Sequence, residues 1–232
     1  MLEYILIGIL LVALPISNLI MYRYAKRVGA QSFFELIAKF GYDNKIKSFK
    51  VLNQQVPKGG IVFLGDSITQ DYNVYEHFPG RLVYNRGIGG DTTPGVINRL
   101  DVSVDELKPS VVVLLIGTND YALLKTNTQD IFERYQEIVS KIKHNNPETK
   151  IMIQSVYPVN ETLDPMTVLP RSNHEIDKLN ALLKTIEGVI YLDIQKILKD
   201  EHGRFHKDYT LEGLHVSPKG YELISKEIEK LL

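Results

Sequence analysis

The sequence predicts an α/β protein in which a central parallel β-sheet is covered by helices on both faces. Three observations support this prediction: short continuous apolar segments recur along the chain, helical periods separate them, and polar or glycine-rich residues follow them. Continuous apolar runs are typical of strands that are buried on both faces. In such sheets a ligand binds at the carboxyl ends of the strands, so the residues that follow each strand are the candidates for a functional site.

Five segments are predicted to form the strands of this sheet. The clearest is Val111–Ile116, which consists of consecutive apolar, mostly β-branched residues and stops at Gly117. The others are shorter but have the same character. In order, the predicted strands are 61–64, 82–84, 111–116, 150–156 and 189–192.

Helices are predicted between and after these strands. Residues 130–143 and 173–187 both place apolar side chains at the spacing of one helical face. The last helix has a clear start, because Ser217 can cap it and Pro218 suits its first position. The alternation of strands and helices over residues 59–232 predicts one folded domain.

The N-terminus has a different composition. Tyr4–Tyr22 contains no charged residue, and as a helix it would be about 28 Å long, close to the thickness of a bilayer's hydrocarbon core. We therefore predict a transmembrane anchor helix over residues 1–24. A buried helix that docks on the domain is the alternative. A cleaved signal peptide is disfavoured, because no basic residue precedes the stretch and no small-x-small site follows it.

The anchor prediction leads to a prediction of localisation. Arg23, Lys26 and Arg27 follow the apolar stretch, and the positive-inside rule would place the domain that follows in the cytoplasm, although the outward orientation stays open. Residues 25–58 are predicted to form a juxtamembrane linker, with a helix over residues 31–40.

Composition and charge exclude several classes of function. The chain has 232 residues, of which 44% are hydrophobic and 24% charged, as in folded globular proteins. A net charge of −1 argues against a broad nucleic-acid footprint. There is no cysteine, which excludes thiolate catalysis and cysteine-ligated metals. His202 and His206 are four residues apart, but Gly203 would interrupt a helix between them, so we expect neither a metal nor a cofactor.

Polar segments follow three of the predicted strands and precede the last helix. They are 65–67, 85–91, 117–120 and 212–215. Together they supply a hydroxyl, flexible glycine backbone, a carboxamide, and an imidazole with a nearby carboxylate. This is the set that acyl transfer requires: a nucleophile, a base, a group that orients the base, and donors for an oxyanion.

These segments resemble, in order and spacing, the conserved blocks of the SGNH (GDSL-type) hydrolase superfamily. The blocks read FLGDSIT around Ser67, NRGIGGDTT around Gly90, LLIGTND around Asn119 and EGLHVSPKGY around His215. The resemblance covers residues 58–232 and is strongest to the bacterial lysophospholipase-like and platelet-activating-factor-acetylhydrolase-like esterases. It implies a flavodoxin-like three-layer α/β/α fold with a five-stranded parallel sheet.

The resemblance also implies residue roles. Ser67 would be the nucleophile and His215 its base, while the backbone N–H groups of Ser67 and Gly90 and the side chain of Asn119 would form the oxyanion hole. The family usually has Asp three residues before the histidine, where this chain has Glu212. Three interpretations stay open: Glu212 orients His215, Asp208 or a backbone carbonyl does so, or the enzyme is weakened.

The predicted function is therefore that of a membrane-anchored serine esterase. Its substrate would be a small-molecule ester, a lipid or an O-acetylated carbohydrate. Two alternatives are an O-acyltransferase with the same residues and a catalytically weakened binding protein. Tyr157–Arg171 follows the fourth predicted strand and has the length of a lid or specificity loop, in which Arg171 would contact an anionic substrate group or form a surface ion pair. The oligomeric state is not predicted.

Overall fold

A computed structural model describes the backbone of residues 2–232 and the side chains of residues 13–26, 28–29, 36 and 39–232. The chain divides into two compact units, residues 1–43 and residues 44–232, and each is described by itself. The first unit consists of helix α1 (Leu2–Leu52), whose last residues belong to the second unit. All strands and all other helices of the described chain lie in the second unit.

Within the described residues, no helix is both long enough and apolar enough to cross a lipid bilayer. This finding corrects the predicted transmembrane anchor over residues 1–24, and with it the predicted single-pass membrane localisation and the membrane as a partner. Residues 4–12 of the predicted span lie outside the described side chains.

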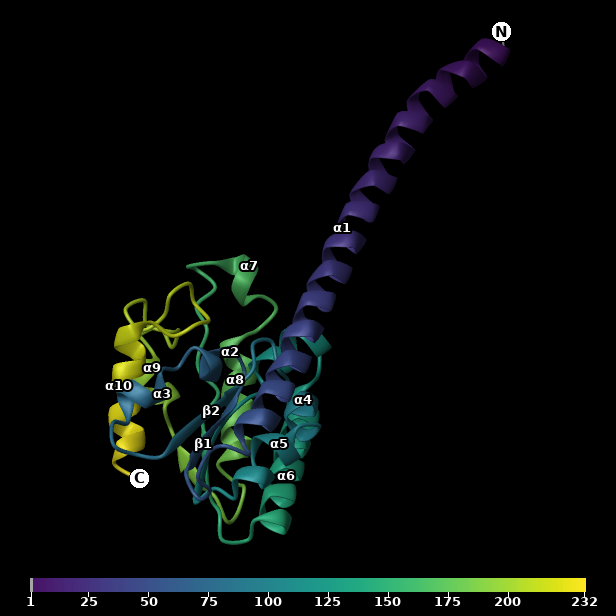
Figure 1. Cartoon of the computed structure of the whole chain (residues 1–232). Coiled ribbons are helices and arrows are strands. Elements are labelled where there is room, and N and C mark those ends of the chain that lie inside the picture. The colour runs from purple at the N-terminus through teal and green to yellow at the C-terminus, as the bar shows by residue number, and fades with distance from the viewer. Residues whose placement is uncertain (1) are drawn as a thin grey trace. The chain divides into compact units, whose positions relative to one another are not determined.

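The second unit is built on a sheet of 5 parallel strands in the order β2-β1-β3-β4-β5 (Figure 1). This is the flavodoxin-like order, in which the chain switches winding direction between β1 and β3. The predicted parallel sheet and its strand number are therefore confirmed. The strands are β1 (Ile61–Gly65), β2 (Val83–Gly87), β3 (Val111–Leu115), β4 (Lys150–Gln154) and β5 (Ile190–Leu192).

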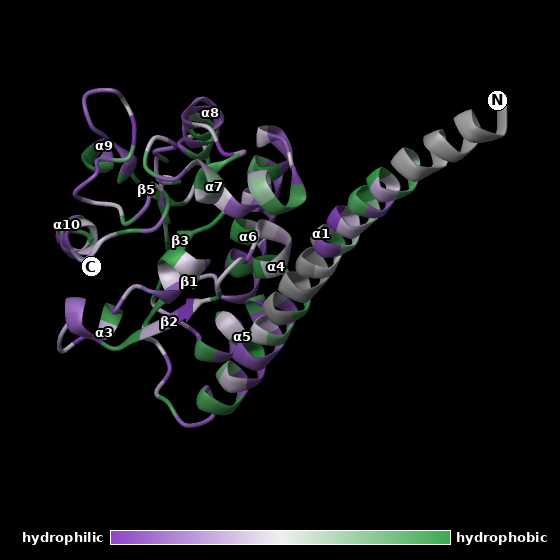
Figure 2. Cartoon of the chain, turned by 90° about the horizontal axis from the view of Figure 1, so that it is seen from above, coloured by the Kyte–Doolittle hydropathy of each residue, from purple (hydrophilic) through white to green (hydrophobic). Residues whose placement is uncertain are grey.

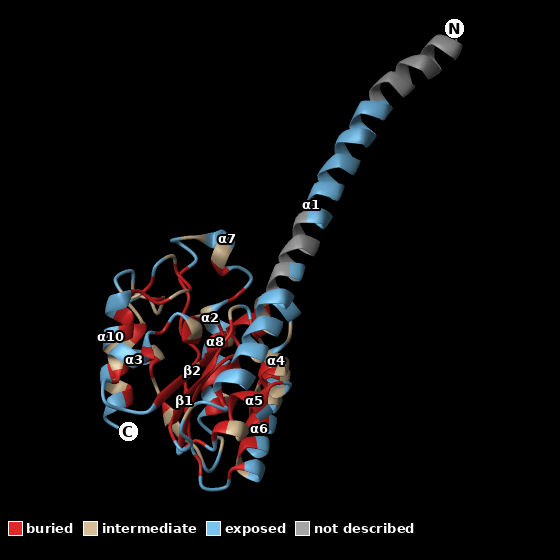
Figure 3. Ribbon diagram, in the orientation of Figure 1, coloured by how far each residue is buried: buried red, intermediate tan, exposed pale blue. Residues whose placement is uncertain are grey.

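The sheet is buried on both faces, as its continuous apolar strands predict (Figure 3). Along β1, Val62 and Leu64 pack into one core cluster, while Ile61 and Phe63 pack into the other. Every residue of β3 is hydrophobic and buried; Figure 2 colours the chain by hydropathy. Only β2 departs clearly from its prediction, because it continues to Gly87 and includes the polar pair Asn85 and Arg86.

Helices form the two outer layers. Tyr135 and Ile138 of α6 and Leu179 of α8 contribute to the first core cluster, and Ile224 of α10 contributes to the second. Ser217 caps α10 as predicted, since its Oγ accepts a hydrogen bond from the backbone N–H of Gly220 at 3.2 Å.

The bounds of these helices are as follows. The first cluster draws on α4 (Thr93–Ile97), α5 (Leu100–Ser103), α6 (Thr128–Asn145) and α8 (Asn173–Leu183). The second draws on α2 (Ser67–Gln70), α3 (Val74–His77), α9 (Gln195–Leu198) and α10 (Pro218–Glu229). The single turns η1 (Asp105–Leu107), η2 (Asp120–Leu124) and α7 (Pro165–Val168) lie in the connections.

Candidate active site

The turn that carries Ser67 connects β1 directly to α2. Gly65 ends the strand, and a Cβ there would lie 2.2 Å from the Leu115 carbonyl oxygen, so only glycine fits. Asp66 is the N-cap of α2, because its Oδ1 accepts the backbone N–H of Ile68 at 3.0 Å. Ser67 is therefore the first helical residue, where a backbone N–H has no acceptor within the helix.

Ser67 and His215 are 148 residues apart in the sequence and meet at this turn. The distance from Ser67 Oγ to His215 Nε2 is 3.1 Å. The other ring nitrogen of His215, Nδ1, is hydrogen-bonded to Oε1 of Glu212. With the imidazole proton on Nδ1, the free lone pair of Nε2 faces the serine hydroxyl, which is the arrangement a general base requires.

Of the acidic residues weighed as partners for His215, only Glu212 contacts its ring. Asp208 instead accepts a hydrogen bond from Lys219 Nζ at 2.9 Å on the exposed surface. The structure thus brings together Ser67, His215 and Glu212 and leaves Asp208 outside the cluster.

The turn from Glu212 to His215 is held by its own hydrogen bonds. The hydroxyl of Thr210 donates to the His215 carbonyl at 2.7 Å and accepts the N–H of Gly213 at 2.9 Å. Gly213 has a φ of +104°, and a Cβ there would lie 2.2 Å from the Asn160 carbonyl oxygen. Any side chain at position 213 would therefore displace the turn that presents the histidine.

Gly89 and Gly90 follow β2 and lie beside the serine turn. A Cβ on Gly89 would be 4.0 Å from Ser67 Cβ, and the Gly89 N–H donates to Gln70 Oε1 at 3.1 Å. Gly90 has a φ of +74° and is exposed. Among the described residues its N–H has no hydrogen-bond acceptor, so it is free to donate to a ligand.

Asn119 follows β3 and lies against the same glycine loop. Its Nδ2 donates to the Asp91 carbonyl at 3.0 Å, and its side chain is buried. An amide NH₂ has two hydrogens, so one is left for a second acceptor. The predicted oxyanion residues thus lie at the carboxyl ends of three neighbouring strands.

Buried ion pairs and hydrogen bonds fix these loops, and sequence reasoning missed most of them. Asp91 is paired with Arg99 at 2.8 Å, and both side chains are almost fully buried. Asp120 accepts the N–H of Thr93 at 3.0 Å and so ties the loop after β3 to the loop after β2. The sequence offered no signal for Arg99, which lies in the turn between α4 and α5, because arginine side chains are usually solvated.

Arg171 does not form the surface ion pair that was one of the two roles expected for it. It is buried, and its Nη2 donates to Asn119 Oδ1 at 2.8 Å, while its Nε donates to the Thr118 carbonyl at 3.0 Å. It therefore forms no surface ion pair and does not reach toward solvent. The only sequence signal was its place in the loop that follows β4.

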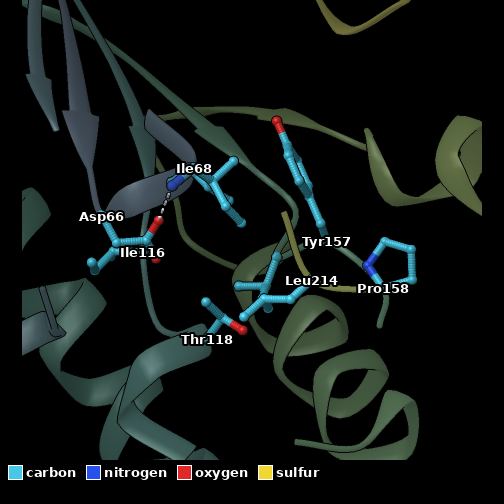
Figure 4. Close-up of a pocket in the computed structure, with 9 residues that line it drawn as sticks. Asp66, Ile68, Ile116, Thr118, Tyr157, Pro158 and Leu214 are labelled. Carbon is cyan, nitrogen blue, oxygen red and sulfur yellow. Dashed lines mark hydrogen bonds between the residues drawn. The ribbon is translucent and has the colours of Figure 1, made fainter. Parts of the chain in front are cut away.

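A narrow pocket lies next to the serine turn, and its walls are so close together that no space for a water molecule remains (Figure 4). Strand ends and the turn before His215 supply its walls, which are mostly apolar. Burial raises the pKa of Asp66 to about 7, and one oxygen of this carboxyl has no hydrogen-bond partner in the described structure. The pocket is lined by Asp66, Ile68, Leu115, Ile116, Thr118, Val156, Tyr157, Pro158 and Leu214.

The two histidines weighed as metal ligands face different partners. The His202 ring lies 3.7 Å from Glu201, whereas the His206 ring packs against Tyr209 with centroids 4.8 Å apart. In the part of the chain that is described, no three His, Cys, Asp or Glu side chains form a cluster that could hold a metal ion.

Comparison with known proteins assigns the chain to a family. The model of the GDSL-like lipase/acylhydrolase family matches residues 63–223, so the chain belongs to this family and is a GDSL-type serine esterase. The resemblance found in the sequence is thereby confirmed.

Individual relatives agree with this assignment. Human platelet-activating factor acetylhydrolase IB subunit alpha2 is 28% identical over 193 residues, which cover 78% of this chain and 80% of the relative. A Streptococcus pneumonia structure described as a platelet activating factor has a TM-score of 0.81 and 29% identity, covering 87% of this chain and 97% of that one. A GDSL-like lipase from Bacteroides thetaiotaomicron has a TM-score of 0.70 at 22% identity, covers 80% and 96% of the two chains, and supports the fold alone.

Proposed function

We propose that this protein hydrolyses a carboxylic ester with a short acyl group through an acyl-enzyme on Ser67. One observation carries the proposal: Ser67 Oγ lies 3.1 Å from His215 Nε2, while Nδ1 of the same ring is hydrogen-bonded to Glu212. A hydroxyl, a base and a group that orients the base in one chain of contacts form the arrangement that activates a serine nucleophile.

The chemistry follows from these contacts. His215 Nε2 takes the proton from Ser67 Oγ as that oxygen attacks the ester carbonyl carbon. The tetrahedral intermediate collapses, the bond to the alcohol breaks, and His215 returns the proton to the departing alkoxide. A water molecule then attacks the acyl-enzyme with His215 again as the base, which releases the acid and restores Ser67. Glu212 stabilises the imidazolium that forms in both halves.

Three donors are proposed for the oxyanion: the backbone N–H groups of Ser67 and Gly90, and Nδ2 of Asn119. Their positions at adjacent strand ends, and the unused N–H of Gly90 and second amide hydrogen of Asn119, support this role. The loss of one such donor typically lowers turnover about 10²–10³-fold, so we expect a reduction of that order for Asn119→Ala.

The pocket beside Ser67 favours a small acyl group. Ile68, Leu214 and Tyr157 line it so closely that no water-sized space remains between them, which disfavours a long acyl chain there. The relatives named acetylhydrolase also favour a short acyl group, since an acetyl group is the smallest acyl group with a carbon chain.

The test is hydrolysis of p-nitrophenyl acetate, butyrate and octanoate by the full chain and by Ser67→Ala. We expect the acetate to give the highest kcat/KM and Ser67→Ala to lose turnover by at least about 10³-fold. Undiminished turnover in Ser67→Ala would refute the serine mechanism, and a preference for octanoate would refute the short-acyl assignment. A rate that needs an added alcohol acceptor would identify acyl transfer instead of hydrolysis.

A further inference from the structure

We propose that Arg171 is a positioning residue for the oxyanion site, because it holds the Asn119 carboxamide with its NH₂ group turned toward the reacting carbonyl. The inference rests on the proposed function, since it assigns a residue to the same reaction. Arg171 itself does not touch the serine or the histidine.

Each of the three side-chain nitrogens of Arg171 donates at least one hydrogen bond. Nη2 donates to Asn119 Oδ1 at 2.8 Å, and Nε donates to the Thr118 carbonyl at 3.0 Å. Nη1 donates to the carbonyls of Thr167 at 2.9 Å and Val168 at 3.2 Å. The side chain therefore joins the loop after β4 to the turn after β3, and one of its hydrogen bonds holds the side-chain oxygen of Asn119.

The contact with Oδ1 decides which end of the amide faces the site. A carboxamide has two ends of nearly equal shape, and a flip would present its oxygen to the oxyanion, where it would repel the developing charge. A guanidinium has only donors, so it can hold only the oxygen end of Asn119. The nitrogen end is then fixed toward the Asp91 carbonyl, which it contacts at 3.0 Å, with its second hydrogen left over.

The charge of Arg171 adds a second effect. The residue is 7% exposed, and within the described structure no carboxylate lies at ion-pair distance from its guanidinium. Burial lowers its pKa from the usual value, but an arginine side chain stays protonated at neutral pH. A cation that binds the amide oxygen polarises the amide, so Nδ2–H becomes a stronger donor to the oxyanion.

The experiment measures kcat and KM of the full chain with p-nitrophenyl acetate for Arg171→Met and Arg171→Lys, each alone and combined with Asn119→Ala. We expect Arg171→Met to lower kcat about tenfold to a hundredfold with little change in KM, because only the transition state uses the amide. Arg171→Lys keeps a positive charge and should recover part of this loss. In the Asn119→Ala background, Arg171→Met should cost less than roughly threefold more.

A matched control separates positioning from general support of the loop. Asn173 fastens the same loop, since its Oδ1 accepts the Val159 N–H at 2.8 Å and its Nδ2 donates to the Val159 carbonyl at 2.9 Å. It does not contact Asn119. Asn173→Ala should lower the melting temperature but leave kcat within about twofold of the wild type.

Two results would overturn the inference. The first is an equal loss of kcat from Arg171→Met with and without Asn119, which would mean that Arg171 acts on the loop alone. The second is an unchanged side-chain NH₂ signal of Asn119 in NMR spectra of Arg171→Met and Arg171→Lys. The NMR measurement needs no substrate. If the wild type hydrolyses no ester, the proposed function fails, while the NH₂ signal still decides the role of Arg171.

Discussion

Replacement of Glu212 is the sharpest test of the proposed triad, because this residue stands where the family usually has aspartate. Removal of the carboxylate in a serine triad costs about 10⁴-fold in kcat when that carboxylate is buried. Here the side chains are partly open, with 26% of Glu212 and 32% of His215 exposed. Water can therefore replace part of the lost contact, and we expect Glu212→Ala to lower kcat about 10²–10³-fold, or about 3–4 kcal/mol of transition-state stabilisation.

Two further variants use the geometry of the same turn. In Glu212→Gln an amide NH₂ can donate to His215 Nδ1, which would move the ring proton to Nε2, so this variant should be at least as impaired as alanine. In Glu212→Asp the carboxylate falls short by roughly one carbon–carbon bond, about 1.5 Å. Gly213 packs against the Asn160 carbonyl and holds the turn in place, so the backbone cannot advance to close the gap. We expect Glu212→Asp to retain more activity than alanine but less than the wild type.

The assay is hydrolysis of p-nitrophenyl acetate at saturating substrate, with thermal unfolding of each variant as a check on folding. Asp208→Ala is the matched control, because Asp208 is an exposed acid four residues away that pairs with Lys219. It should stay within about twofold of the wild type. Wild-type kcat in Glu212→Ala, or an equal loss in Asp208→Ala, would refute the assignment of Glu212.

Three predictions concern stability. The pKa of Asp66 is raised to about 7, so the folded state holds its proton more tightly than the unfolded state. As the pH rises from 5 to 8, the free energy of unfolding measured in urea should therefore fall by about 3 kcal/mol more in the wild type than in Asp66→Asn. Plots of stability against pH that run parallel for the two proteins would contradict the reasoning. Arg99→Met should cost about 3–5 kcal/mol in the same measurement, because it leaves Asp91 buried without its partner, and a loss below 1 kcal/mol would show that the pair is not buried in solution. Gly213→Ala should lower both the melting temperature and kcat, because its Cβ would meet the Asn160 carbonyl and move the histidine turn; a fully active, equally stable variant would exclude this close contact.

Much of the site's location could be predicted from the sequence. Parallel strands place their carboxyl ends at one edge, so residues that follow different strands meet there even when they are far apart in the chain. This is why Ser67, Gly90 and Asn119, which follow β1, β2 and β3, could be expected at one site. Local signals also sufficed for the last helix, whose start at Ser217 depends on residues within one turn.

The orientation of the site residues could not be predicted in the same way. The contact between Arg171 and Asn119 joins residues 52 positions apart, and nothing local distinguishes Arg171 from a solvated arginine. The prediction of a membrane anchor was wrong for a related reason. A hydropathy window evaluates an uncharged stretch as if it were an independent helix, and within the described residues no helix meets the length and apolarity that a span requires.

Two buried arginines donate hydrogen bonds to backbone carbonyl oxygens at the carboxyl ends of the strands, where the negative potential of these oxygens would oppose the reaction. The carboxyl ends of parallel strands present backbone carbonyl oxygens, and the proposed reaction develops negative charge at the same edge. Arg99 donates to the carbonyls of Gly65 at 3.0 Å and Arg86 at 2.9 Å, which lie at the ends of β1 and β2.

Arg171 donates to the Thr118 carbonyl at 3.0 Å, just beyond the end of β3. Each guanidinium covers acceptors that would otherwise repel an oxyanion. Arg171 also adds a positive charge with no carboxylate at ion-pair distance in the described structure, whereas the charge of Arg99 is offset by its ion pair with Asp91. Neither arginine contacts Ser67, yet both determine the potential in which its reaction takes place. On this reasoning, the potential at the strand ends depends on these two side chains as well as on the oxyanion donors themselves, so neutral replacements at positions 99 and 171 should lower kcat even where the fold is retained.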